Sequence, residues 1–236
     1  AMPNTAGAAR FENELKHACG TVASIQKHKC RAFCATEDGT WREEVFAAWR
    51  RLGEPRKVPG TELVAQAGLF SPDHPDPGSV LLAEHLPAGL RGRVADLGAG
   101  WGFLAAAILR RCPKVERVDL YEADARALDC ARLNLRAHGA RTGFFWHDVR
   151  RGVPEGYDAV VMNPPFHEGR DTRLEVGLDF IATTARALKR GGGLYLVANR
   201  QLPYEGALTQ SGLSCRAAGG DATYKLLFAV KSTALP

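Results

Sequence analysis

The chain has 236 residues, of which 45% are hydrophobic and 24% are charged, values typical of a soluble globular protein. No apolar run approaches the roughly 20 residues that a membrane-spanning helix needs, and no charged-then-apolar leader is visible. We therefore expect a cytoplasmic protein with no membrane contact. The formal net charge of +5 favours an anionic partner but does not identify it.

Six cysteines without a secretion signal indicate free thiols rather than a disulfide framework. Five possible zinc ligands gather near the start of the chain, although their spacing matches no standard zinc motif. We expect ordinary thiols and no metal, with zinc binding as the alternative. These five residues are His17, Cys19, His28, Cys30 and Cys34.

The composition changes near Pro59, so residues 1–58 are interpreted as an appendage or as the remnant of a larger N-terminal domain. Its stretch TWREEVFAAWRRLGEPRKVPG predicts a helix with Thr40 as N-cap, Glu43 three residues later and Gly53 at its end. Three apolar residues of this helix would share a face that needs a packing partner: Val45, Ala48 and Trp49.

Residues 59–236 form one predicted domain in which apolar strands alternate with amphipathic helices, the pattern of an α/β fold with a mainly parallel sheet. The Gly191-Gly192-Gly193 run is expected to end the last helix. Strands are predicted at 93–97, 115–121, 142–146, 159–162 and 194–198, and helices at 103–111, 125–138 and 173–189.

The stretch VADLGAGWG leads the first strand into a turn with Gly98, Gly100 and Gly102. Glycines allow positive φ and close approach of a ligand to the backbone. A tight turn without a ligand is the alternative. The third glycine comes one residue too early for a dinucleotide-binding fingerprint. With Asp96 just before the turn, the pattern resembles the first motif of class I S-adenosylmethionine-dependent methyltransferases.

This resemblance implies a Rossmann-like fold, with a mainly parallel seven-stranded sheet and helices on both faces. It also implies an S-adenosylmethionine site. Glu122 ends the second strand in DLYEAD, where an acidic side chain can accept from both ribose hydroxyls. Asp148, in FFWHDV, would hold the adenine amino group, and the Val149 amide would face a ring nitrogen. A solvated charge and a plain loop aspartate are the respective alternatives.

Trp101 and Trp146 could flank the cofactor, but we expect core packing for each of them.

After the fourth strand comes Asn163-Pro164-Pro165-Phe166, which resembles the fourth motif of methyltransferases that act on conjugated amino groups. The Asn163 oxygen and the Pro164 carbonyl can accept the two N–H bonds of such a group. The prolines restrict the backbone, and Phe166 offers a face for stacking a planar base. A strand-ending tight turn is the alternative.

Three further segments, NPPFHEG, VANRQLPYEGAL and YKLLFAV, resemble the bacterial small-subunit ribosomal RNA guanine-N2 methyltransferases. The resemblance implies ribosomal RNA or the small subunit as partner. It also places the Asp76-x-Gly78-Ser79 element of LFSPDHPDPGSVLL near the amino-acid end of the cofactor, with Ser79 as a cofactor-binding residue. His167 is expected to position the substrate, with simple packing as the alternative, and Glu168 could accept from the guanine edge.

Three alternatives stay open: a protein glutamine N5-methyltransferase, an adenine N6-methyltransferase, and a non-catalytic cofactor-binding module that binds RNA. The first would not need a basic surface, whereas residues 1–58 hold ten Lys or Arg against seven Asp or Glu. Loss of Asn163 would be expected in the non-catalytic module, yet Asn163 is present.

Overall fold

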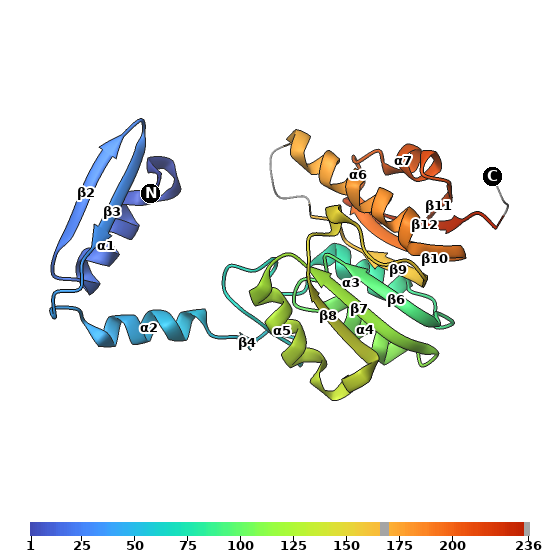
Figure 1. Ribbon diagram of the computed structural model, residues 1–236, viewed down its shortest axis with the longest axis horizontal. Helices are drawn as coiled ribbons and strands as arrows, with labels where there is room; N and C mark the ends of the chain where they lie inside the picture. Colours follow the sequence, from blue (N-terminus) through green and yellow to red (C-terminus); the bar gives the residue numbers. More distant parts are fainter. Residues whose placement is uncertain (166–169, 234–236) are drawn as a thin grey trace. The chain divides into compact units, whose positions relative to one another are not determined.

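The computed structural model describes residues 1–165 and 170–233, and of residues 170–173 only the backbone. The chain divides into two compact units, Ala1–Glu54 and Pro55–Pro236, called unit 1 and unit 2 below (Figure 1). Within the described ranges, every helix is too short or too polar to cross a bilayer.

Unit 1 is a small three-stranded antiparallel sheet with two helices, arranged in the strand order β1-β3-β2. The β2–β3 hairpin turns through His28 and Lys29, both at positive φ, as two-residue hairpin loops require. The elements are β1 (Met2–Pro3), the 3₁₀ helix η1 (Asn4–Ala6), α1 (Ala8–Ala18), β2 (Val22–Lys27), β3 (Cys30–Ala35) and α2 (Glu43–Gly53).

Helix α2 ends at Gly53 as predicted, but the predicted N-cap is wrong. The helix begins at Glu43 with Arg42 as its N-cap residue and no side-chain capping bond. The Thr40 hydroxyl instead donates to the Asp38 carboxylate, which also accepts from the Thr40 backbone N–H. A local aspartate turn therefore takes the hydroxyl that the helix would need.

Unit 2 contains the predicted seven-stranded sheet, in the order β11-β12-β10-β9-β6-β7-β8. Strands β10, β9, β6, β7 and β8 are parallel to one another. Strand β12 pairs antiparallel with β10, and β11 pairs antiparallel with β12. The strands are β6 (Gly92–Leu97), β7 (Val115–Glu122), β8 (Thr142–Trp146), β9 (Tyr157–Met162), β10 (Leu188–Asn199), β11 (Leu213–Gly220) and β12 (Tyr224–Lys231).

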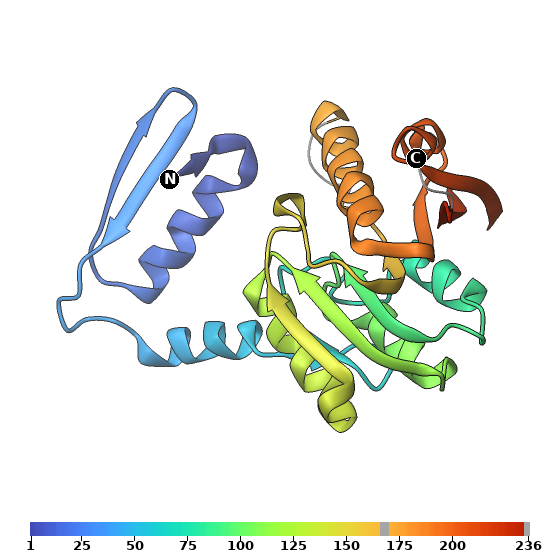
Figure 2. The same cartoon turned by 45° about the vertical axis from the view of Figure 1, so that its right-hand side comes forward.

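Helices cover both faces of this sheet, as predicted (Figure 2). One face carries α3 (Pro77–His85), α4 (Phe103–Arg111) and α5 (Ala125–Leu135), and the other carries α6 (Arg170–Ala187) and α7 (Tyr204–Gln210). Two 3₁₀ helices, η2 (Arg136–Arg141) and η3 (Val149–Arg151), and a two-stranded sheet of β4 (Arg56–Lys57) and β5 (Val64–Ala65) complete the unit.

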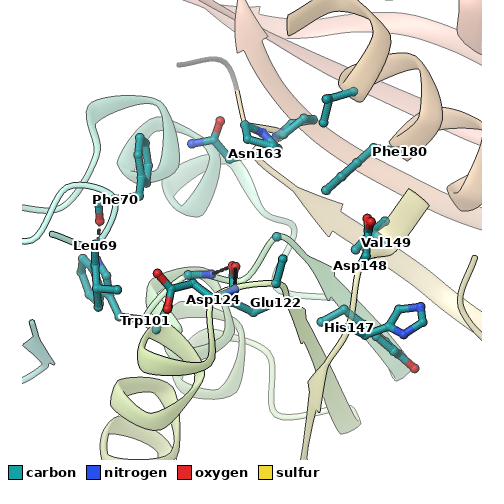
Figure 3. Close-up of a pocket in the computed structure, with 18 of the residues that line it drawn as sticks. Leu69, Phe70, Trp101, Glu122, Asp124, His147, Asp148, Val149, Asn163 and Phe180 are labelled. Atoms are coloured by element: carbon teal, nitrogen blue, oxygen red, sulfur yellow. Dashed lines mark hydrogen bonds between the residues drawn. The ribbon is translucent and has the colours of Figure 1, made fainter. Parts of the chain in front are cut away.

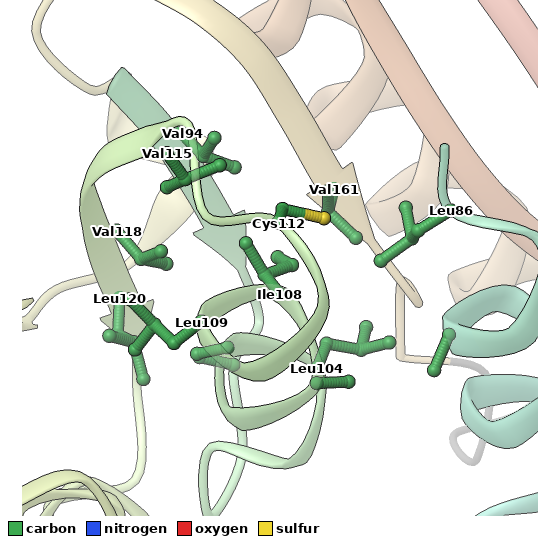
Figure 4. Packing of buried hydrophobic residues seen from close by; sticks show 14 of the residues in the cluster. Leu86, Val94, Leu104, Ile108, Leu109, Cys112, Val115, Val118, Leu120 and Val161 are labelled. Carbon is green, nitrogen blue, oxygen red and sulfur yellow. The ribbon is translucent and has the colours of Figure 1, made fainter. Parts of the chain in front are cut away.

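The core beneath α3, α4 and α5 is formed by aliphatic side chains that alternate along the strands (Figure 4). Val94, Val118 and Leu120 project from β6 and β7 toward Leu104 and Ile108 of α4. Both faces of the sheet are buried, so apolar side chains of these strands point to both sides of it. This packing fixes the carboxyl ends of the strands.

Three predicted helix boundaries in unit 2 differ from the structure. The helix expected to reach His138 ends at Leu135 and continues as η2. Helix α6 starts at Arg170 rather than 173 and ends at Ala187, before the glycine run. The glycines do not end it; they lie inside β10, where the register shifts between Leu188 and Gly193. Strands β11 and β12 were not located by the apolar pattern.

All six cysteines are free thiols, with Cys19 buried and Cys30 and Cys34 exposed. In the part of the chain that the structure describes, no group of three or more His, Cys, Asp or Glu side chains could hold a metal ion.

Candidate functional site

The carboxyl ends of β6, β7, β8 and β9 meet at one edge of the sheet, where a cavity of about 830 Å³ opens. Ligands of open α/β sheets bind at this edge. Figure 3 shows its lining side chains, with Asn163 and Glu122 on different sides of the cavity. Seven of the residues predicted for the site line it: Gly98, Gly100, Glu122, Asp148, Val149, Asn163 and Pro164.

The glycine turn after β6 is held by the neighbouring strand. The N–H groups of Gly98 and Ala99 donate to the Tyr121 carbonyl oxygen at 2.9 and 3.1 Å. Gly100 has φ +54°, and a Cβ built on it would meet no atom within 4 Å. The turn therefore presents bare backbone to open space, which is where a ligand can approach it closely.

Glu122 fastens this turn to the end of β7. Its carboxylate accepts from the Gly100 N–H and from the Asp124 N–H, both at 2.8 Å. A carboxylate offers about four lone-pair positions, so both oxygens can still accept from a ligand. Asp124, which the sequence analysis missed, also lines the cavity and caps α5 through the Arg126 N–H.

Asp148 stands at the start of η3, after the edge strand β8. Its carboxylate accepts from the side chain and the backbone N–H of Arg150. The Arg150 guanidinium holds the pKa of Asp148 below its ordinary value. An ionised, half-exposed carboxylate at the cavity wall can accept a further N–H bond.

Asp96 lies beneath the turn and has no exposed surface. Its Oδ2 accepts from the Ala105 N–H at 3.1 Å, whereas Oδ1 has no hydrogen-bond partner in the described part of the chain. Burial raises the pKa of this carboxyl to about 7. A buried acceptor without a partner is costly. Asp96, which was predicted as a cofactor-binding residue, is not among the residues that line the cavity.

Asn163 follows the end of β9, lines the cavity, and is held by two residues at the start of α3. Its Nδ2 donates to Asp76 Oδ2 and to Ser79 Oγ, both at 2.9 Å. Asp76 is the N-cap of α3, and its Oδ2 also accepts from the Ser79 N–H. Ser79 therefore contacts Asn163 and does not line the cavity.

Gly102, the third glycine of the predicted site, does not line the cavity. It is the N-cap of α4, and a Cβ built on it would lie 3.1 Å from the Ala131 Cβ. Gly102 thus lets α4 and α5 pack closely. Phe166, His167 and Glu168 lie outside the described residues.

The two tryptophans behave differently. Trp101 is buried as expected, and it also lines the cavity, with its indole N–H donating to the Phe70 carbonyl. The prediction of core packing is wrong for Trp146, whose side chain is 72% exposed. It ends the edge strand β8, where its indole N–H donates to the Ala123 carbonyl.

Apolar parts of the lining on two sides of the cavity (Figure 3) were not predicted from the sequence. Leu69 and Phe70 line the cavity from the loop before α3, and Phe180 lines it from α6 (Figure 3). Leu69 and Phe70 open the segment LFSPDHPDPGSVLL, of which only the Asp76-x-Gly78-Ser79 element was expected near the cofactor. The aromatic residue Phe70, in the loop that precedes α3, was the sequence signal that could have predicted this part of the lining.

Comparisons with known proteins agree with this geometry. Residues 60–228 match the model of the methyltransferase small domain family. The chain is similar to ribosomal RNA small subunit methyltransferase C of Escherichia coli (strain K12), with 36% identity over 72% of this chain and 49% of the relative. The protein of the same name from Shewanella loihica is 36% identical over 67% of this chain and 46% of the relative.

Among solved structures, a T. thermophilus 16S rRNA N2 G1207 methyltransferase, solved in complex with AdoMet and guanosine, resembles this chain with a TM-score of 0.75 and 28% identity. The match covers 95% of this chain and 62% of that one. The chain thus spans about half the length of the curated relatives it matches.

Proposed function

Since residues 60–228 match its family model, this chain belongs to the methyltransferase small domain family, and from that premise we propose that it is an S-adenosylmethionine-dependent N-methyltransferase. Its acceptor is the exocyclic amino group of a base in RNA, namely guanine N2 of small-subunit ribosomal RNA. The product of the cofactor is S-adenosylhomocysteine.

One observation carries the proposal. Asn163 and Pro164 line the same cavity as the glycine turn and Glu122. The residues that can accept the amino hydrogens of a substrate therefore face the same cavity as the residues that can bind a nucleoside. The residues present also fit the cofactor, because Gly100 leaves open space at the turn and each Glu122 oxygen has lone pairs left to accept from a ligand.

In this proposal each strand end holds one part of the cofactor. Glu122 accepts from the two ribose hydroxyls, Asp148 accepts from the adenine amino group, and the Val149 amide donates to a ring nitrogen. Gly98 and Gly100 allow close approach, and Asp96 lies at the amino-acid end. Gly102 contributes by setting the packing of α4.

When bound, the cofactor supplies an electrophilic methyl group on a sulfonium. The substrate nitrogen is a poor nucleophile because its lone pair is delocalised into the ring. Asn163 Oδ1 and the Pro164 carbonyl oxygen accept its two N–H bonds and direct the lone pair toward the methyl group. The nitrogen gains the methyl and a positive charge, and it then loses one proton to water, so no side-chain base is required.

Two predicted substrate contacts lie outside the described residues. Phe166 is proposed to stack on the target base, and His167 is proposed to position it. Both remain predictions from the sequence motif.

The RNA substrate is supported by the curated relatives, which are named ribosomal RNA small subunit methyltransferase C. The exposed Lys27 and Lys29 of the unit 1 hairpin suit contacts to phosphates. We propose that residues 1–58 form an appendage or domain remnant that guides RNA to the domain of residues 59–236.

The test uses S-adenosylmethionine with a tritiated methyl group. The chain is incubated separately with small ribosomal subunits, naked small-subunit RNA, and release factors, beside an Asn163→Ala variant as control. We expect label in RNA, and nuclease digestion of that RNA should yield N2-methylguanosine. The variant should transfer far less label.

Other distributions of label identify the alternatives. Label in N6-methyladenosine would contradict guanine N2 as the target, and label in release factors would indicate a glutamine N5-methyltransferase. Cofactor binding without transfer to any of the three would indicate a non-catalytic module.

A further inference from the structure

Asn163 is tied to the start of α3, 87 residues earlier in the chain. Both hydrogens of its amide are engaged, one by Asp76 Oδ2 and one by Ser79 Oγ. Asp76 and Ser79 are themselves buried. Among residues 1–165 and 174–233, whose side chains the structure describes, no hydrogen bond to Asn163 Oδ1 is present.

The chemistry of these partners fixes the orientation of the amide. An ionised carboxylate can only accept hydrogen bonds, so Asn163 must turn its NH₂ group toward Asp76. Its oxygen is then the remaining end. We infer that Asp76 and Ser79 are positioning residues that lock the Asn163 amide, so that its Oδ1 is directed at the amino group of the substrate.

The lock is itself held in place. Asp76 Oδ2 also accepts from the Ser79 N–H at 2.8 Å, and Pro77 begins the helix behind it. A Cβ built on Gly78 would lie 3.0 Å from the Tyr224 ring, so β12 closes the other side. A preorganised acceptor costs no rearrangement during the reaction.

The charge of Asp76 adds a second effect. A hydrogen bond to an ionised group is stronger than a neutral one, and it increases the negative charge on the amide oxygen through polarisation. The substrate nitrogen becomes positive as the methyl group arrives. The Asp76 carboxylate, one hydrogen bond behind Asn163, therefore favours the transition state.

This inference rests on the proposed function, and it gives Ser79 a different role from the cofactor contact that the family resemblance implies. Two experiments separate these points. The first examines the lock without any reaction, and the second examines its effect on catalysis.

In the first experiment, the side-chain NH₂ resonances of Asn163 are followed by NMR in ¹⁵N-labelled protein and assigned by their loss in Asn163→Ala. We expect slow exchange with solvent, with Ser79→Ala and Asp76→Asn each shifting these resonances. Exchange as fast as that of an exposed asparagine would show that Asp76 and Ser79 do not hold the Asn163 amide, whether or not the protein methylates RNA.

In the second experiment, methyl transfer is measured at saturating RNA and cofactor. The double variant Asp76→Asn/Ser79→Ala should lower kcat by about 10-fold to 100-fold, with KM for the cofactor unchanged. In an Asn163→Ala background the same two substitutions should cause no further loss, since they act through Asn163. Asp129→Asn, which removes an exposed carboxylate on α5, is the charge-matched control.

Exchanging the side chains of Asn163 and Asp76 tests the same contact in a second way. Asn163→Asp alone places two carboxylates against each other and should lower kcat by about 100-fold. Adding Asp76→Asn to this variant supplies a hydrogen-bond donor again, and kcat should then rise at least about tenfold above that of Asn163→Asp alone. Additive losses in the Asn163→Ala background, no recovery in the swap, or a rise in cofactor KM alone would overturn the positioning role.

If the wild-type chain transfers no methyl group to RNA, the proposed function fails, and the amide resonances still decide whether the lock exists.

Discussion

Units 1 and 2 are stabilised in different ways. Unit 2 has three clusters of buried apolar side chains on and around its sheet. In unit 1 the buried residues are Ala8, Glu12, Ala18 and Cys19. Glu12 is held there by ion pairs with Lys16 and Arg31, both at 2.6 Å.

The difference indicates which unit can fix a geometry. A close-packed core resists displacement, so unit 2 can hold hydrogen-bonding groups at set positions around its cavity. Unit 1 depends more on charged pairs, which salt screens, and it presents cations on a hairpin. Substitutions at the site in unit 2 should therefore have large effects on chemistry, and those in unit 1 small effects that depend on salt.

The largest effect is expected for Asn163→Ala. Loss of a preorganised acceptor should lower methyl transfer by about 10²–10³-fold at saturating RNA while cofactor binding stays intact. Single-turnover transfer and calorimetry measure the two quantities. Near-normal turnover would show that the two prolines only end a strand.

Glu122→Ala should have the next largest effect. It removes the proposed acceptor of the ribose hydroxyls and should weaken cofactor binding by about 1–3 kcal/mol. Calorimetry provides the measurement. Glu116→Ala, on the exposed start of β7, is the control, and equal affinities for the two variants would remove Glu122 from the site.

Asp96 should make the stability of unit 2 depend on pH. Burial raises its pKa from 3.8 to about 7 in the folded state, so the folded protein binds a proton that the unfolded chain has lost. Without ligand, stability should fall by about 1–3 kcal/mol as pH rises from 5 to 7.5. Thermal unfolding of the wild type and of Asp96→Asn measures it, and the variant should show a flatter dependence. Parallel curves would contradict the assignment.

The smallest effect is expected in unit 1. If the β2–β3 hairpin contacts phosphates, Lys27→Ala/Lys29→Ala should reduce the slope of log affinity against log salt by about one to two. Arg31 is left unchanged because it pairs with the buried Glu12, so replacing it would also destabilise the unit. The matched control is Arg110→Ala/Lys114→Ala in unit 2. An unchanged slope would mean that the two lysines are only a solvated surface.

The elements around the cavity could be predicted because local chemistry and tertiary structure agree there. Alternation of strands and helices located β6, β7 and β8, and strand ends located Glu122 and Asp148. Predictions failed where a tertiary or competing contact decided the outcome. Asp38 takes the Thr40 hydroxyl, and the glycine run fits a bulge within β10.

The contact between Asn163 and Asp76 could not be predicted from spacing. The two residues are 87 positions apart, and only the packing of α3 against the sheet brings its start beside the end of β9. Trp146 was predicted to be in the core because aromatic residues usually are, but β8 is an edge strand. Edge position depends on strand order, which a local pattern does not contain.

The placement of the four tryptophans has an optical consequence. Trp41 and Trp49 lie in unit 1, whereas the buried Trp101 lies in the cavity wall with its indole bonded to the Phe70 carbonyl. A chain that keeps only Trp101 would therefore have fluorescence that responds to occupancy of the cavity. A chain that keeps only Trp41 and Trp49 would emit from unit 1 alone, so the two units could be followed separately in one instrument.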